Sequence, residues 1–239
     1  MNNTNRNTIL FLLLTIGVIF LFLINISLGS VSIPLKEVFK SLTVGNISKE
    51  TWHYIIVNYR LPKAIAAILV GMGLSISGLL MQTLFRNPLA GPYVLGLSSG
   101  ASLGVAIVIL GAALLPPFLA TFLVSYVGIV LASSLGSFAV LLAVLAVSHR
   151  LRDTMAILIV GLMFGSLTSA IVGTLTYFST AEQLQKFTFW SLGNLGNLSW
   201  TAIALLSSCV VIGLLFSLFS IKPLNALLLG EKKKKSLGL

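Results

Sequence analysis

Six long apolar stretches, with no ionisable side chain in their interiors, constrain this sequence more than any other feature. They cover approximately residues 9–28, 63–82, 93–115, 118–147, 154–178 and 198–220. A helix needs about 20 apolar residues to cross the roughly 30 Å of hydrocarbon in a bilayer. Strands of a membrane barrel would alternate apolar and polar residues over about ten positions, and these stretches do not alternate. We therefore predict an all-α fold, a polytopic transmembrane helical bundle of about six spans that forms one domain over residues 1–239.

The composition supports a membrane protein. The chain is 57% hydrophobic and only 8% charged, with a mean hydropathy of +1.06. A soluble core does not need this much apolar material, whereas helices that face lipid do. The first apolar stretch is longer than the 7–15 residues usual in a cleaved signal peptide, and no small-x-small cleavage site follows it. We interpret it as a transmembrane helix, with a removed signal as the alternative.

Basic residues predict the orientation. The net charge is +10. The short loop 148–153 (SHRLRD) is basic, whereas the loop 179–197 contains a single basic residue, Lys186. Because short cytoplasmic loops are enriched in Lys and Arg, this difference places both termini in the cytoplasm.

The residues that the spans lack narrow the possible mechanisms. Proton-coupled carriers commonly bury ionisable groups, so charge-free spans argue against them, although Na⁺ sites built from carbonyls and hydroxyls would escape this test. His53 and His149 lie in loops on opposite predicted sides, and Cys209 stands alone in an apolar stretch. We therefore expect no catalytic centre, metal site, bound cofactor or nucleic-acid partner. No GxxxxGK[ST] motif occurs, so the energy for any active transport must come from another subunit.

Small residues mark one face of the fifth stretch. Gly161, Gly165, Ser169 and Gly173 recur every four positions, which aligns them along a helix. Such a face lets another helix approach closely. Ordinary packing within one subunit and the lining of a pathway or subunit interface remain open as alternatives.

The segments that flank the second stretch contain turn and cap signals. Asn87-Pro88 and Gly91-Pro92 should break the chain after that stretch. Within 29–57, Ser32 can cap a short amphipathic helix with Pro34 in its first turn. We expect this helix to lie along the outer surface, with solvated lysines.

Three strings resemble a known family when taken in order. They are RLPKAIAAILVGMGLSISGLLMQTLFRNPLAGPYVLGLSSGAS at 60–102, FWSLGNLGNLSW at 189–200 and LNALLLGEKKKKSLGL at 224–239. Together they resemble the permease subunits of ATP-driven importers for iron–siderophore, haem and vitamin B12. The first string is highly specific, and the resemblance covers essentially the whole chain.

The resemblance implies partners and roles. It implies a bacterial inner-membrane subunit that works with an ATP-binding cassette ATPase, a substrate-binding protein, a second permease copy and membrane lipid, with ATP used only by the ATPase. Arg60 and Lys63 match basic residues that pair with glutamates of the binding protein, with interfacial anchoring as the alternative. In such permeases the fifth helix lines the translocation pathway, so the resemblance implies a pathway role for the Gly161–Gly173 face. The cytoplasmic segment 222–239 matches the part of the family that docks into the ATPase. The resemblance therefore implies that coupling to the ATPase involves Leu224, Asn225, Leu229, Gly230, Glu231, Ser236, Leu237 and Gly238.

Two departures from the family leave other hypotheses open. The family has about ten helices where about six are expected here, so a truncated, non-transporting protein of the same ancestry is the alternative function. The run Lys232–Lys235 replaces a stretch that is more often acidic, and it is either a lipid-binding or a solvated tail. An ion-coupled secondary carrier is a third hypothesis, which the charge-free spans disfavour.

Overall fold

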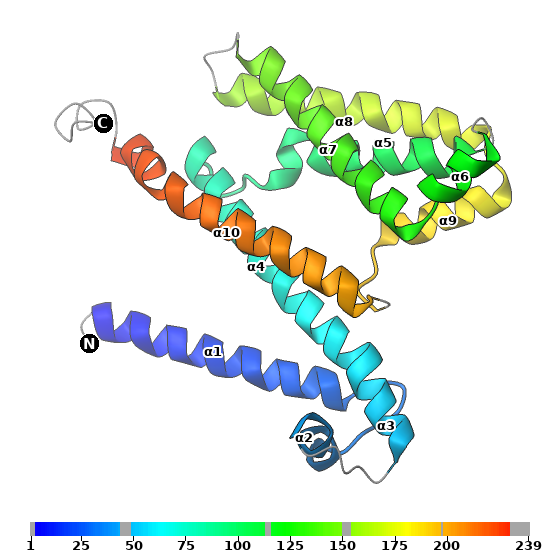
Figure 1. The fold of residues 1–239 in the computed structure, drawn as a ribbon. Helices are drawn as coiled ribbons and strands as arrows, with labels where there is room; N and C mark the ends of the chain where they lie inside the picture. Colours follow the sequence, from blue (N-terminus) through cyan, green and yellow to red (C-terminus); the bar gives the residue numbers. More distant parts are fainter. Residues whose placement is uncertain (1–2, 44–48, 113–115, 150–153, 197, 230–239) are drawn as a thin grey trace. The chain divides into compact units, whose positions relative to one another are not determined.

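The computed structural model describes residues 3–43, 49–112, 116–149, 154–196 and 198–229 (Figure 1). Within these ranges every regular element is helical, which confirms the predicted all-α class. The elements are α1 (Asn3–Ser27), α2 (Leu35–Thr43), α3 (Glu50–Ile55), the π-helical turn η1 (Ile56–Arg60), α4 (Leu61–Phe85), the 3-10 turn η2 (Pro92–Leu95), α5 (Leu97–Ile109), α6 (Pro117–Leu123), α7 (Tyr126–Ser148), α8 (Thr154–Tyr177), α9 (Ala181–Leu192) and α10 (Trp200–Leu229).

Five of the helical segments are long and apolar enough to cross a membrane, so the chain is a multi-pass membrane protein. They are Asn5–Ser27, Glu50–Phe85, Tyr126–Ser148, Ala156–Tyr177 and Trp200–Leu228. The predicted span at 93–115 is instead the 13-residue helix α5, too short for the hydrocarbon at 1.5 Å per residue. Gly96, with φ of +74°, separates it from η2. Since α5 packs against α7, α8 and α9, contact with protein accounts for most of its apolar residues.

Two other predicted boundaries differ from the structure. The long stretch 118–147 is two helices, because the chain breaks after α6 and Ser125 starts α7 by accepting a hydrogen bond from the Gly128 amide at 3.3 Å. The amphipathic helix α2 begins at Leu35, and the Pro34 carbonyl, not the Ser32 side chain, accepts from the Glu37 and Val38 amides.

The chain divides into two compact units, residues 1–73 with 194–216 and residues 74–193 with 217–239. In the first unit, α2, α3 and η1 gather at the C-terminal end of α1 (Figure 1). Their buried core consists of Ile26, Ile33, Val38, Ile56 and Ala64. Most apolar side chains along α1 are exposed, as expected of a helix that faces lipid.

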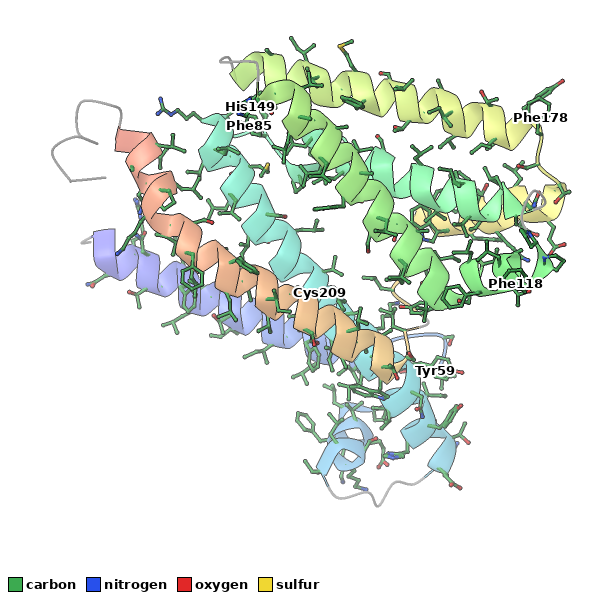
Figure 2. The ribbon with its side chains drawn as sticks, turned by 45° about the horizontal axis from the view of Figure 1, so that its top comes forward. Tyr59, Phe85, Phe118, His149, Phe178 and Cys209 are labelled. Atoms are coloured by element: carbon green, nitrogen blue, oxygen red, sulfur yellow. The ribbon has the colours of Figure 1, made fainter. Side chains whose placement is uncertain are left out.

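In the second unit, α5 packs against α7, α8 and α9. Glycine lets the backbones of α5 and α7 meet, because a Cβ atom on Gly104 would overlap the carbonyl oxygen of Ala132. One further turn along, Gly100 faces Gly136 in the same way. The Ser137 hydroxyl of α7 also donates to the Leu97 carbonyl of α5 at 2.9 Å. At the periphery of this unit, Phe118 and Phe178 are exposed (Figure 2).

Candidate functional site

The small-residue face of α8 divides into a packed half and an open half. A Cβ atom on Gly161 would overlap the Val94 carbonyl oxygen, and one on Gly165 would lie 3.3 Å from the Ser99 hydroxyl oxygen. These two glycines therefore let α8 pack against η2 and α5. By contrast, a Cβ atom on Gly173 would meet nothing within 4 Å, and Ser169 is exposed. The packing interpretation fits the first half of the face, and the second half remains available to line a pathway.

Two hollows run along this face of α8. The first has a volume of about 470 Å³ and is lined by Ser98, Ser99, Ser102, Thr168, Ser169, Val172, Gly173, Thr176, Phe187 and Ser191. The second has a volume of about 460 Å³ and is lined by Tyr93, Gly96, Ser99, Gly161, Leu162, Gly165, Ser166 and Ser169. Ser99 and Ser169 belong to both linings. Among the residues that the structure describes, neither lining contains a charged side chain, so hydroxyl groups supply most of their polarity.

The hydroxyl groups on α8 have a fixed orientation. Thr168 and Ser169 both donate to the Gly165 carbonyl, at 2.8 and 2.9 Å, and Thr176 donates to the Gly173 carbonyl at 2.7 Å. Since a hydroxyl has only one hydrogen to donate, these groups can offer only lone pairs to a molecule in the hollow. The wall formed by α8 is thus polar, uncharged and accepting. Sequence reasoning identified Ser169 and missed the other hydroxyls, although the run of serines at 98, 99 and 102 is visible in the sequence.

Arg60 and Lys63 occupy different environments. Arg60 is 8% exposed. Its Nη1 atom donates to the carbonyls of Ile26 and Ser27, each at 2.7 Å, and Nη2 donates to the carbonyl of Val31. Lys63, one turn further along, is exposed. The structure thus gives Arg60 a capping role at the end of α1, while the pairing of either residue with a binding protein stays a prediction.

The predicted coupling segment begins inside a helix. The apolar stretch was expected to end near residue 220, yet α10 continues through Pro223 to Leu229 over 30 residues. Leu224 is half-buried and Asn225 is exposed in its last turns. The backbone of Leu229 ends the helix, and Gly230, Glu231, Ser236, Leu237 and Gly238 lie outside the described residues.

Arg86 connects the end of α4 to the end of α10 within the second unit, a role that sequence reasoning missed. Its guanidinium donates to the Leu227 carbonyl, one of the last carbonyls of α10. Its backbone has φ of +48°, and the Arg86 and Asn87 amides donate to the Thr83 and Gln82 carbonyls. This is the Schellman arrangement that ends many helices, with arginine in the place that glycine usually takes.

Among the described residues, no three His, Cys, Asp or Glu side chains lie close enough together to hold a metal ion. His53 instead has a polar neighbour in the first unit, since its Nδ1 atom lies 3.0 Å from the hydroxyl oxygen of the buried Ser41.

Comparison with known proteins identifies relatives of this chain. The hemin transport system permease protein HmuU of Yersinia pestis is 35% identical over 228 residues, which cover 95% of this chain and 66% of the relative. The vitamin B12 import system permease protein BtuC of Escherichia coli is 33% identical over 199 residues, 83% of this chain and 58% of the relative. The chain therefore spans about two thirds or less of the length of these relatives.

A solved structure and a family model agree with these relatives. The structure, described as an inward-facing conformation of a metal-chelate type ABC transporter, matches with a TM-score of 0.78 and 28% identity, over 98% of this chain and 68% of that one. The model of the FecCD transport family matches residues 17–239. The predicted resemblance is thereby confirmed, and the chain belongs to the FecCD transport family.

Proposed function

We propose that this chain forms the membrane-spanning permease subunit of an ATP-driven importer for an iron chelate, haem or a corrinoid. The observation that carries the proposal is the family match over residues 17–239. The substrate class follows from the names of relatives, which transport hemin and vitamin B12. ATP hydrolysis takes place on a separate ATPase subunit, so this chain is not itself an enzyme.

The open half of the α8 face is the part of the structure that best suits a translocation pathway. A pathway must pass a large polar cargo without holding it tightly, and an uncharged wall of hydroxyl acceptors can do so, because it offers hydrogen bonds without fixed ion pairs. Ser169 and Gly173 lie on this wall, and Ser98, Ser99 and Ser102 of α5 line the same hollow.

The partners follow from the same proposal. A binding protein delivers substrate at the outer side, where the exposed Lys63 is the better placed of the two predicted docking residues. A second permease copy completes the pathway. The C-terminal end of α10, with Leu224 and Asn225, approaches the ATPase. The protein lies in the bacterial inner membrane with its N-terminus in the cytoplasm, as the basic 148–153 loop indicates.

Uptake into vesicles tests this function. The chain is reconstituted in proteoliposomes with the ATPase subunit and binding protein of its source, and uptake is measured for labelled hemin, a ferric hydroxamate chelate and cyanocobalamin. We expect ATP-dependent uptake of one of the three. Uptake that follows an ion gradient without ATP would instead establish a secondary carrier, and no uptake of any probe would contradict an importer of this substrate class.

A matched pair of variants links the uptake to α8. Gly173→Leu should fill the hollow and abolish uptake, whereas Gly213→Leu in α10 should leave it intact. Both glycines lie in long apolar helices, and a Cβ atom at either would meet nothing within 4 Å. Equal uptake by the two variants would remove the α8 hollow from the pathway.

A further inference from the structure

The short helix α2 lies directly beside the end of a membrane span. Only residues 28–34 separate it from α1, and its Val38 packs in the same buried core as Ile26, the residue before the last of α1. A helix with its side chains is about 10 Å wide, so α2 lies within about one helix diameter of the end of that span. A helix that spans the hydrocarbon ends where the headgroup region begins, so α2 lies at about the depth of the lipid headgroups.

One face of α2 is buried and another exposes large apolar side chains. Glu37, Val38 and Ser41 face the core. Leu35, Phe39 and Leu42 are 45%, 51% and 43% exposed, and their spacing of i, i+4 and i+7 forms one stripe. Exposed apolar residues also continue from the end of α1 toward this stripe, through Leu28 and Val31. The lipid-facing surface of α1 thus extends along the chain to α2.

The charges of α2 are sorted by face. Glu37 is turned inward and lies 3.1 Å from the Lys40 Nζ atom. Lys36 is exposed and has no ion-pair partner in the part of the chain that the structure describes. The outer surface of α2 therefore combines an apolar stripe with the exposed cation of Lys36, while the charge of Lys40 is paired with the inward-facing Glu37. This is the pattern of a helix that lies in the plane of a membrane interface.

We propose that α2 is an interfacial helix, which inserts Leu35, Phe39 and Leu42 into the bilayer beside α1 and places Lys36 against the phosphates of anionic lipid. The helix then anchors the end of α1, which Arg60 caps, at a fixed depth in the membrane. A protein partner would need to cover the stripe and supply an acidic group for Lys36, whereas an anionic membrane provides both next to the span.

Site-specific fluorescence tests this placement on the whole chain. Cys209→Ala removes the one native cysteine, and Phe39→Cys is then labelled with an environment-sensitive nitrobenzoxadiazole dye. Thr51→Cys, at an exposed position of α3 in the same unit, is the matched control. Both proteins are reconstituted in phosphatidylcholine vesicles, with and without phosphatidylglycerol.

At position 39 we expect emission at shorter wavelength, quenching by lipids brominated on the acyl chain, and iodide quenching about threefold weaker than at position 51. Lys36→Glu should reduce the part of this protection that depends on phosphatidylglycerol. Leu42→Cys provides a second position on the stripe and should behave like Phe39→Cys. The proposal can therefore still be tested if one of the two variants fails to fold.

Two results would overturn the proposal. Iodide quenching at position 39 as strong as at position 51 would show that the stripe faces water. Protection from both iodide and brominated lipid would show that a protein covers it, either a second copy of this chain or a partner.

Discussion

The Nη1 atom of Arg60 lies 2.7 Å from the carbonyl oxygen of Ile26, 34 residues earlier in the sequence. The carbonyls at the end of a helix have no amide partner within the helix, and a cation is favoured there by the helix dipole. Arg60 satisfies such carbonyls at the end of α1 and also reaches Val31 beyond it. One side chain at the end of η1, directly before α4, thus fixes the end of α1 and the turn that follows.

Arg60→Met should therefore destabilise the first unit. Hydrogen bonds from a charged group contribute about 1.5–3 kcal/mol, and a loss of this order is expected for the variant. Lys63→Met removes a charge from the same region at an exposed position and should leave stability unchanged. Thermal unfolding of both variants in one detergent measures the difference. Equal melting temperatures would show that the Arg60 contacts do not hold α1.

Docking of a binding protein should depend on Lys63. Lys63→Glu replaces an exposed cation with an anion, and exposed charge pairs contribute about 0.2–1 kcal/mol, so docking should weaken by a factor of about 1.4 to 5 at low salt. High salt should reduce the difference, because it screens exposed charges. Binding of the purified binding protein to the reconstituted permease measures both effects. Arg60→Lys, which retains the charge, controls for indirect effects of the Arg60 site, and docking that Lys63→Glu leaves unchanged would remove Lys63 from the interface.

The helical class and most spans could be predicted from the sequence because lipid and length leave a strong one-dimensional pattern. The difference between the predicted span at 93–115 and the short helix α5 has a physical cause, since burial in protein and exposure to lipid both favour uncharged apolar residues. Only helix length distinguishes the two, and here it depends on Gly96 and the turn before it. The Gly100 and Gly104 spacing was an unused signal that α5 packs closely against another helix.

The candidate site was less predictable because its contacts join distant parts of the sequence. An arginine before an apolar span is equally compatible with a docking residue and with a helix cap, and the sequence does not show which carbonyls lie beside it. The same holds for Arg86, whose partner Leu227 is 141 residues away. The α8 face was visible because its residues repeat within one helix.

Close contact of α5 and α7 should make Gly104 intolerant of any side chain. Gly104→Ala places a methyl group against the Ala132 carbonyl, and such overpacking costs about 1–3 kcal/mol. Gly78→Ala in α4 is the matched control, because its Cβ would meet nothing within 4 Å and alanine favours a helix by about 1 kcal/mol. Detergent-induced unfolding of the two variants should shift in opposite directions. A stable Gly104→Ala protein would contradict the close approach.

The Glu182–Lys186 pair on α9 should respond to pH in a defined direction. Their side chains are 2.8 Å apart, and the hydrogen bond and positive charge of Lys186 hold the pKa of the Glu182 carboxyl below its usual value. A lowered folded-state pKa stabilises the protein above the unfolded pKa, and this contribution disappears as pH falls through the folded pKa. Lys186→Met should raise the pKa of Glu182 toward its usual value, measured by carbon NMR titration. Melting temperature at neutral pH should hardly change, since the pair is exposed.

Arg86 should have two separable effects, one from its backbone and one from its side chain. Its left-handed conformation costs a non-glycine residue about 1–2 kcal/mol, so Arg86→Gly should preserve the end of α4. The same variant loses the bond to the Leu227 carbonyl, so amides in the last turn of α10 should exchange hydrogen faster.

Hydrogen exchange of peptides that cover 80–90 and 220–229 distinguishes these effects. Arg86→Gly should accelerate exchange only in the second peptide. Arg86→Val should accelerate it in both, because valine disfavours the left-handed backbone and has no donor for the Leu227 carbonyl. Unchanged exchange at 220–229 in both variants would show that Arg86 does not hold α10. Since Leu224 and Asn225 lie next to that turn, the expected result would make Arg86 the link between the α4–α5 turn and the predicted ATPase-coupling residues.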